Sequence, residues 1–446
     1  MSDTEALMWQ IERDPVLRSS FSTVTFLDGQ PDVDRFRQRM TGALVAIPRL
    51  RQRVVPPPAG LGVPTWADDP EFDLDYHIRR AALPAPAGDR ELLDLAAVLQ
   101  QDPFDPVRPL WQFTLVEGLS GDRTALIVKM HHTISDGVGA VRLSTQFIDI
   151  ERDPPPPAAS GPRDVGTDGN GPSLVEAAGD ALRRPIGLGL KALSGMAGAM
   201  TRPVETTGSA WSAIRQLIVT DPARSPLWAG KRGAARRFEI VSTDLEAAKG
   251  AAKALGGTVN DLYVTALAGA AGAYHRAKGS EVDELRVSVP ISTRADKSAG
   301  GNSFVPTRLL VPAGELDPAE RFRLVHERMT SVKQDRTLGM GDGLAAVAAG
   351  LPGSVLTKLA RSQVQTVDFA ASNLRGAPFD LFVAGAEVLA NHPFGPTGGT
   401  AFNATVLSYR GSMDIGLNID TAAVDDGPLL RTLVEQAFQE LTAVNL

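Results

Sequence analysis

Residues 128–140 read VKMHHTISDGVGA, a stretch that places two adjacent histidines, an aspartate and a glycine directly after apolar residues. The residues TALIVKM, from Thr124 onward, are apolar and β-branched, which predicts a buried strand that ends near Met130. SDG then predicts a turn, and GAVRLSTQFIDI has helical periodicity. The histidine pair is therefore expected at a strand-to-loop junction, where side chains can be held on a rigid scaffold.

The chemistry of the pair depends on which ring faces a cavity. Adjacent strand residues point to opposite faces, so only one of His131 and His132 can do so unless the chain turns. A neutral imidazole, with an ordinary pKa of about 6.5, can take a proton from a hydroxyl. Asp136 can orient that imidazole or brace the loop through an arginine, and Gly137 permits unusual backbone angles. A structural cluster is the main alternative; a zinc site is a weak one, because the spacing lacks a helical HExxH partner.

Strand and helix patterns alternate outward from this motif on both sides. SFSTVTFL from Ser20 predicts a strand, Val33 to Ile47 a helix, and Trp66 to His77 an extended segment. RELLDLAAVLQQ is helical, and LWQFTLVEGL is a further strand. A second patterned region begins near Arg236 and contains similar alternations, including a long helix capped by Thr258 or Asn260. The expected fold class is α/β (α+β).

Length and composition bound the domain organisation. A chain of 446 residues is too long for one ordinary core, so two domains are expected. The stretch DPPPPAASGPRDVGTDGNGPS has the Pro, Gly and Ser density of an exposed connector. We predict an N-terminal domain over 1–153, a linker and helical crossover over 154–235, and a C-terminal domain over 236–446. The crossover is basic, which favours either a solvated helix pair or an interfacial element that touches anionic lipid or an acyl substrate.

Charge and residue usage exclude several function classes. A net charge of -7 argues against general nucleic-acid binding. The absence of cysteine removes disulfides, thiolate metal sites and a cysteine nucleophile. The start, MSDTEALMWQIERD, has neither the basic nor the apolar part of a signal peptide, and no stretch of roughly 18 strongly apolar residues occurs. We therefore expect a cytoplasmic protein, with peripheral contact at the inner membrane or lipid droplets left open.

The HHxxxDG spacing resembles the active-site motif of the CoA-dependent acyltransferase superfamily, which includes chloramphenicol acetyltransferase and condensation domains. Over nearly its whole length the chain resembles the bacterial wax ester synthase/diacylglycerol acyltransferase family. The N-terminal SDTEALMWQIE only approximates the family's opening motif, so no role is assigned to it. The supporting stretches, in chain order, are PRLRQRVV from Pro48, FDLDYHIRR from Phe72, RPLW from Arg108, HHTISDG, ND at Asn260, VPISTR from Val289, GN at Gly301, SNLRGAP from Ser372 and FNATVLSYRGSMDIGL from Phe402.

The resemblance implies two chloramphenicol-acetyltransferase-like domains with mixed sheets and an active-site tunnel between them. It implies transfer of a fatty acyl group from acyl-CoA, a co-substrate and not a bound cofactor, to the hydroxyl of diacylglycerol or a long-chain alcohol. His132 would be the general base and His131 would help to hold the loop, while Asp136 would be structural, paired with Arg294. Asn260 would donate a hydrogen bond to the oxyanion; its alternative role is a helix N-cap.

Four further residues are candidates for substrate contact. Trp111, in RPLW, can lie along the acyl path, although a Trp at a strand entrance is more often a core residue. Asn403, Thr405 and Ser408 are polar in an apolar strand and can line the tunnel, an arrangement that plain strand alternation explains as well. Two other functions stay open: a non-catalytic lipid-droplet surface or scaffold protein on an acyltransferase fold, and an acyltransferase that uses another hydroxyl acceptor.

Overall fold

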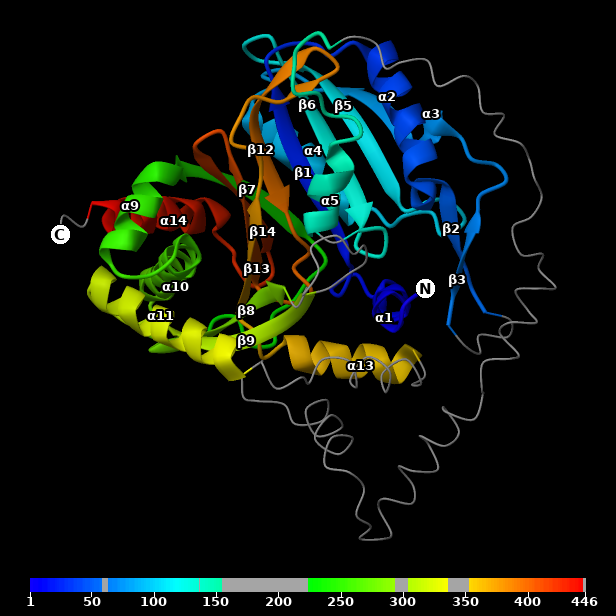
Figure 1. Cartoon of the computed structure of the whole chain (residues 1–446). Helices are drawn as coiled ribbons and strands as arrows, with labels where there is room; N and C mark the ends of the chain where they lie inside the picture. Colours follow the sequence, from blue (N-terminus) through cyan, green and yellow to red (C-terminus); the bar gives the residue numbers. More distant parts are fainter. Residues whose placement is uncertain (58–62, 136, 155–223, 293–303, 336–352, 444–446) are drawn as a thin grey trace, which may run out of the picture.

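The computed structural model describes residues 1–57, 63–135, 137–154, 224–292, 304–335 and 353–443. Two six-stranded sheets form its frame, with strand orders β11-β12-β1-β6-β5-β4 and β7-β14-β13-β10-β8-β9, and a separate pair joins β2 to β3. Both large sheets are mixed, and helices pack on them (Figure 1). The expected α/β fold with two sheet-rich parts is confirmed.

The first sheet carries the histidine motif and is covered on both faces. The helix α2 packs on one face through Phe36 and Met40, against Trp111 and Phe113 of the sheet. On the other face, Leu92 and other apolar residues of α4 pack against the alternate residues of β1, β5 and β6. The elements of this half are α1 (Asp3–Ile11), β1 (Ser20–Leu27), α2 (Val33–Ala46), η1 (Pro48–Arg51), β2 (Gln52–Val55), β3 (Thr65–Asp68), α3 (Leu74–His77), β4 (Ile78–Ala82), α4 (Asp89–Gln101), β5 (Trp111–Leu119), β6 (Arg123–His131) and α5 (Gly137–Ser144).

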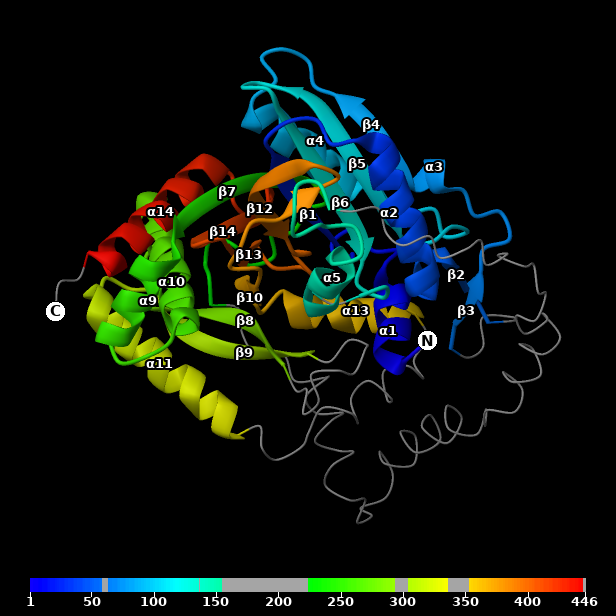
Figure 2. The same cartoon turned by 45° about the horizontal axis from the view of Figure 1, so that its top comes forward.

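The second sheet is covered on its outer side by the helices α9, α10, α11 and α14 (Figure 2). The helix α10 is buried almost throughout, because alanine and glycine let its neighbours approach closely. The elements are β7 (Arg236–Asp244), α9 (Leu245–Ala254), α10 (Val259–Ala277), β8 (Glu284–Ser292), β9 (Phe304–Pro312), α11 (Pro318–Asp335), α13 (Gly353–Val364), β10 (Phe369–Arg375), β11 (Phe382–Val383), β12 (Ala386–Phe394), β13 (Phe402–Tyr409), β14 (Ser412–Asp420) and α14 (Gly427–Thr442).

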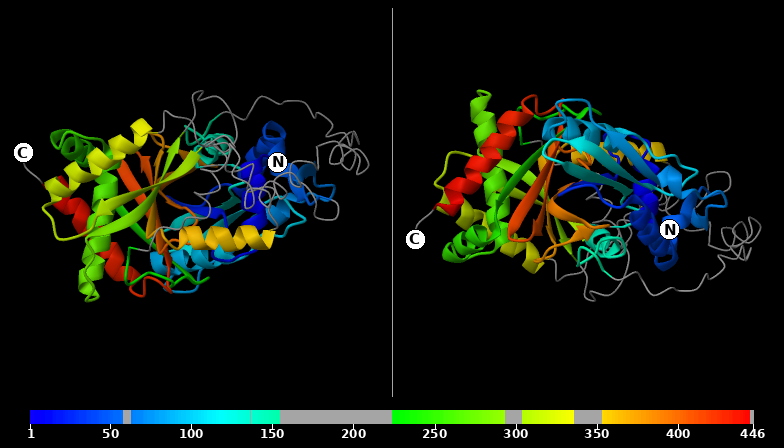
Figure 3. Two further views of the ribbon diagram at one scale, coloured as in Figure 1. Left: turned by 90° about the horizontal axis from the view of Figure 1, so that it is seen from below. Right: turned by 90° about the horizontal axis from the view of Figure 1, so that it is seen from above.

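The second half of the chain contributes a strand to the first sheet. β12 belongs to the second half of the sequence but pairs antiparallel with β1 in the first sheet, with Ser22 opposite Phe394. The ring of Phe394 stacks on that of Phe238 in β7, with centroids 3.9 Å apart. A Cβ on Gly416 of β14 would lie 2.1 Å from the carbonyl oxygen of Pro393, so this crossing requires glycine. The halves lie side by side (Figure 3), and α4 of the first half contacts β7 of the second.

Several local predictions need correction. The strand β6 runs one residue beyond Met130 and ends at His131, which pairs with Ser20. The segment from Trp66 to His77 is not extended throughout, because it ends in the short helix α3 at Leu74–His77. The helices α1, α13 and α14 were not predicted. Most of the predicted crossover, from residue 155 to residue 223, lies outside the described residues. Among the described helices, none is long and apolar enough to cross a bilayer.

Candidate active site

The ring of His131 is locked inside the first half. Its side chain is fully buried, and its Nε2 lies 3.0 Å from a carboxylate oxygen of Glu12. The backbone N–H of Thr133 donates to Nδ1 over 3.1 Å. Since Nδ1 accepts, Nε2 carries the proton and donates it to the carboxylate. With both ring nitrogens engaged, His131 is placed as a scaffold residue.

His132 is the first residue after the end of β6. Its backbone N–H donates to the carbonyl of Ser19 over 3.1 Å, and a turn follows at once, because the N–H of Ile134 donates to the carbonyl of His131. His132 as a whole is partly exposed, its Nδ1 is buried, and its ring lies against Phe21, with ring centroids 4.8 Å apart. The turn therefore separates the two neighbouring imidazoles. Gly137 begins α5 immediately after the motif.

Glu12 is a site residue that sequence reasoning missed. It is the C-cap of α1, and its Oε2 accepts from the backbone N–H of Ser19 over 2.8 Å as well as from His131. A separation of 119 residues lies between Glu12 and His131, so no local pattern connects them. One feature of the sequence points to Glu12: it ends the stretch SDTEALMWQIE, which approximates the family's opening motif.

Asn260 lies in the first turn of α10, and the N-cap of that helix is Thr258 instead. The hydroxyl of Thr258 accepts from the N–H of Asp261, whose buried carboxylate in turn accepts from Thr258 and lies 2.8 Å from Nδ1 of His326. Because Thr258 and Asp261 form the capping box, the side chain of Asn260 does not cap the helix. Its Oδ1 accepts from Nδ2 of Asn373 over 3.2 Å, and its own amide nitrogen has no partner among the described residues.

The two candidate groups come from different halves of the chain, and the helix after the histidine motif contacts the second sheet. The helix α5, which starts directly after the histidine motif, packs against β10. β10 carries Asn373, the hydrogen-bond partner of Asn260. Figure 2 shows α5 on the side of β10. The helix that follows the HHxxxDG motif thus contacts the strand that holds the side chain of Asn260.

Trp111 lies in the core of the first half, the alternative position that the sequence left open for it. Its side chain is fully buried, and its indole N–H donates to the carbonyl of Leu50 over 2.8 Å. The ring stacks on His77, with centroids 4.4 Å apart, and meets Phe113 edge-on. Burial lowers the pKa of His77 to about 4, so this imidazole is neutral.

Asn403, Thr405 and Ser408 hold loops at strand ends. The amide of Asn403 donates to the carbonyl of Pro396 over 2.7 Å and accepts from the hydroxyl of Thr405. The N–H of Gly376 donates to the carbonyl of Ser408 over 3.0 Å and to its hydroxyl over 3.4 Å. The first two are buried, and their polar atoms are engaged within the protein. These bonds account for the three polar residues without a substrate, so their assignment to the tunnel wall gains no support.

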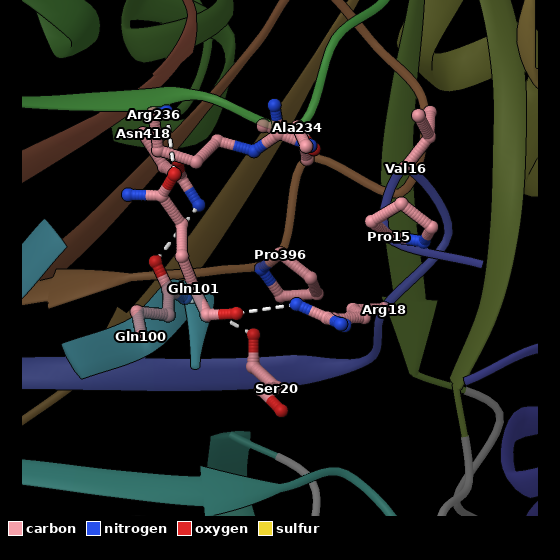
Figure 4. Close-up of a pocket in the computed structure, with 11 residues that line it drawn as sticks. Pro15, Val16, Arg18, Ser20, Gln100, Gln101, Ala234, Arg236, Pro396 and Asn418 are labelled. Carbon is pink, nitrogen blue, oxygen red and sulfur yellow. Dashed lines mark hydrogen bonds between the residues drawn. The ribbon is translucent and has the colours of Figure 1, made fainter. Parts of the chain in front are cut away.

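A small pocket lies at the junction of the two halves, next to the start of β1 (Figure 4). The amide of Gln100 donates to the carbonyl of Ser20 and accepts from Asn418, so it ties α4 to β1 and β14. The volume of the pocket, about 30 Å³, is close to that of one water molecule, so the pocket cannot hold an acyl chain. The residues that line it include Arg18, Ser20, Gln100, Arg236, Pro396 and Asn418.

Two predicted residues, Asp136 and Arg294, lie outside the described residues, and so does their predicted ion pair. Within the described part of the chain, no three His, Asp or Glu side chains gather into a set that could hold a metal ion.

Comparison with family models decides the wider relationship. Residues 1–263 match the wax ester synthase/diacylglycerol acyltransferase catalytic domain, and residues 300–442 match the C-terminal domain of the same family. The chain belongs to this family. It is therefore an acyltransferase of the wax ester synthase/diacylglycerol acyltransferase type, and the alternative of a non-catalytic scaffold is set aside.

Curated relatives within the wax ester synthase/diacylglycerol acyltransferase family extend over almost the whole chain. A candidate diacylglycerol O-acyltransferase of Mycobacterium tuberculosis H37Rv is 36% identical over 455 aligned positions, which cover 100% of this chain and 92% of that protein. Another from the same strain, named tgs1, is 29% identical and covers 93% of this chain and 89% of its own length.

Solved structures support the same fold for this family member. The wax ester synthase/diacylglycerol acyltransferase of Marinobacter aquaeolei superposes with a TM-score of 0.68 at 22% identity, covering 99% of this chain and 98% of that one. The first condensation domain of the calcium-dependent antibiotic synthetase superposes with a TM-score of 0.59 at 16% identity, covering 100% of this chain and 99% of that one. At these identities the likeness concerns the fold alone.

Proposed function

We propose that this chain transfers a fatty acyl group from acyl-CoA to the hydroxyl of a diacylglycerol, with a long-chain alcohol as the alternative acceptor. Family membership and the names of the mycobacterial relatives support this substrate class. The observation that carries the chemistry is the difference between two adjacent imidazoles. His131 is buried and bonded at both nitrogens, whereas His132 is partly exposed beyond the end of β6.

In this proposal His132 is the general base, and no acyl-enzyme forms. The imidazole takes the proton of the acceptor hydroxyl while the hydroxyl oxygen bonds to the thioester carbonyl carbon. The tetrahedral intermediate then collapses, the carbon–sulfur bond breaks, and the imidazolium returns the proton to the CoA sulfur. The absence of cysteine and of a G-x-S-x-G elbow agrees with direct transfer, because neither common nucleophile motif is present.

Asn260 is the proposed donor to the oxyanion of the intermediate. Asn373 holds its Oδ1, which turns the amide nitrogen away from that bond and leaves it able to donate. Removing one such donor commonly costs on the order of 10²–10³ in kcat. Asp261 supports this placement by closing the first turn of α10.

The acceptor sets where the reaction would take place. Diacylglycerols and long-chain alcohols partition into bilayers, so we infer that the protein makes peripheral contact with the inner membrane or lipid droplets when it takes up its acceptor. A cytoplasmic location stays a prediction from the sequence.

The first experiment measures CoA release by purified protein. Palmitoyl-CoA is supplied together with either dioleoylglycerol or hexadecanol in phospholipid vesicles, and a thiol-reactive dye follows the product. Because the chain has no cysteine, the dye detects only released CoA. We expect acceptor-dependent release, and mass spectrometry identifies triacylglycerol or wax ester.

A reaction without acceptor measures hydrolysis of the thioester, and the His132→Ala variant measures the background. CoA release that is the same with and without acceptor would contradict the transferase proposal. An ester formed only with another class of hydroxyl would keep the chemistry and replace the acceptor.

A further inference from the structure

We propose that Glu12 is a positioning residue that fixes both histidines of the motif through one carboxylate oxygen. The inference rests on the proposed function of His132. Oε2 of Glu12 accepts from Nε2 of His131 over 3.0 Å and from the backbone N–H of Ser19 over 2.8 Å. The carbonyl of Ser19 accepts in turn from the backbone N–H of His132 over 3.1 Å.

The geometry forms a closed clamp around the end of β6. One arm runs from Glu12 to the ring of His131, and the other runs through the peptide unit of Ser19 to the backbone of His132. The strand pairing of β1 with β6 ends at Ser20 and His131, and the bond from His132 to Ser19 holds the next residue of the chain beyond that pairing. Glu12 therefore acts where regular strand pairing stops.

Burial makes the clamp stiff. The Glu12 side chain is 15% exposed and that of His131 is fully buried, so water competes weakly for these bonds. Trp9 of α1 packs edge-on against His131, with centroids 6.3 Å apart, and adds a second contact between α1 and the motif. A base displaced by about 1 Å can lose about 10²-fold in rate, so a clamp of this kind controls kcat.

Two conservative variants separate geometry from charge. Glu12→Gln keeps the length and an amide oxygen that can accept from both N–H groups. Glu12→Asp keeps the charge but retracts the carboxylate by one methylene. We expect Glu12→Gln to retain most of the wild-type kcat, and Glu12→Asp to lose much more of it. Glu12→Ala should lose about 10²-fold in kcat, with little change in the KM for acyl-CoA.

Glu5→Ala is the matched control. Glu5 closes the capping box of the same helix with Ser2, so this variant weakens α1 without touching the clamp. It should lower the unfolding midpoint and leave kcat unchanged. In spectra of ¹⁵N-histidine-labelled protein, the Nε2–H tautomer signal of one histidine should persist in Glu12→Gln and Glu5→Ala and shift in Glu12→Asp.

Specific results would overturn the inference. Full activity in Glu12→Ala, the opposite order of Glu12→Gln and Glu12→Asp, or an equal loss of kcat in Glu5→Ala would each do so. Failure of the proposed function looks different, because wild-type protein would then release no CoA or His132→Ala would be fully active.

Discussion

At the scale of single residues, two chemically identical side chains acquire opposite roles from their backbone positions. His131 ends a strand, so its ring follows the pleat into the interior and meets Glu12 and the N–H of Thr133. His132 begins a turn, and its ring emerges beside Phe21. The imidazole to which we assign proton transfer belongs to His132, the residue that follows the end of the strand and is partly exposed.

This difference predicts distinct losses in two alanine variants. His132→Ala should lose about 10²–10⁴-fold in kcat while it keeps the wild-type unfolding midpoint, because a positioned base contributes roughly that factor. His131→Ala should instead lose stability, by about 1–3 kcal/mol, because the partly buried carboxylate of Glu12 loses one of its two donors. Its loss of kcat should be smaller. Steady-state kinetics and urea unfolding of both proteins test this, and the reverse order of kcat would transfer the role of base to His131.

At the scale of elements, the site depends on how closely helices approach the second sheet. α10 presents Asn260 at its first turn and is buried along most of its length. Gly272 makes this possible, because a Cβ there would lie 1.7 Å from the carbonyl oxygen of Ala313, just beyond β9. Glycine destabilises a helix interior by about 1 kcal/mol relative to alanine, so the close packing at Gly272 must stabilise the fold by more than that.

A matched pair of glycine substitutions tests that balance. Gly272→Ala should destabilise the protein by about 1–3 kcal/mol despite the better helix propensity, because the carbonyl of Ala313 must move. Gly250→Ala, in α9, should stabilise it by about 0.5–1 kcal/mol, because nothing lies within 4 Å of the added Cβ. Urea unfolding of both variants gives the two free energies. Stabilisation by both would mean that propensity outweighs packing in α10.

At the scale of the whole molecule, β12 from the second half joins the two sheets by pairing with β1. Buried imidazoles lie in both halves and at their junction. His77 lies in the first core, His275 in α10 and His392 in β12, and burial lowers the pKa of each. For His77 the pKa falls to about 4, and its Nε2 has no partner among the described residues. Protonation would place an unpaired N–H and a charge in a dry core.

The pH dependence of stability follows from these pKa values. Each folded pKa lies below the unfolded value of about 6.5, so the unfolded state binds more protons as the pH falls. The contribution is complete above about pH 7 and is lost between about pH 6.5 and pH 4. His77 alone should account for about 3 kcal/mol of that loss. We expect the free energy of unfolding to fall across this window, and less steeply in His77→Phe. An equal slope in the two proteins would mean that His77 is protonated inside the fold.

The sequence by itself determined most of the local structure and the motif that carries the chemistry. β-branched alternation located β1 and β6, helical spacing located α2 and α4, and HHxxxDG pointed to the family. These signals are local, since each depends on side-chain periods of two or 3.6 residues within one segment. The prediction of an extended segment from Trp66 to His77 was less accurate, because the single helical turn in it is too short to show a helical period.

Only the tertiary structure decided which imidazole is locked, what locks it, and which strands share a sheet. The bond from Glu12 to His131 spans 119 residues, β12 reaches β1 across hundreds of positions, and Thr258 rather than Asn260 caps α10. Trp111 became a core residue for the same reason, since its surroundings come from three separate segments. Such pairings are selected by the burial and hydrogen bonding of distant groups, and local periodicity contains no information about them.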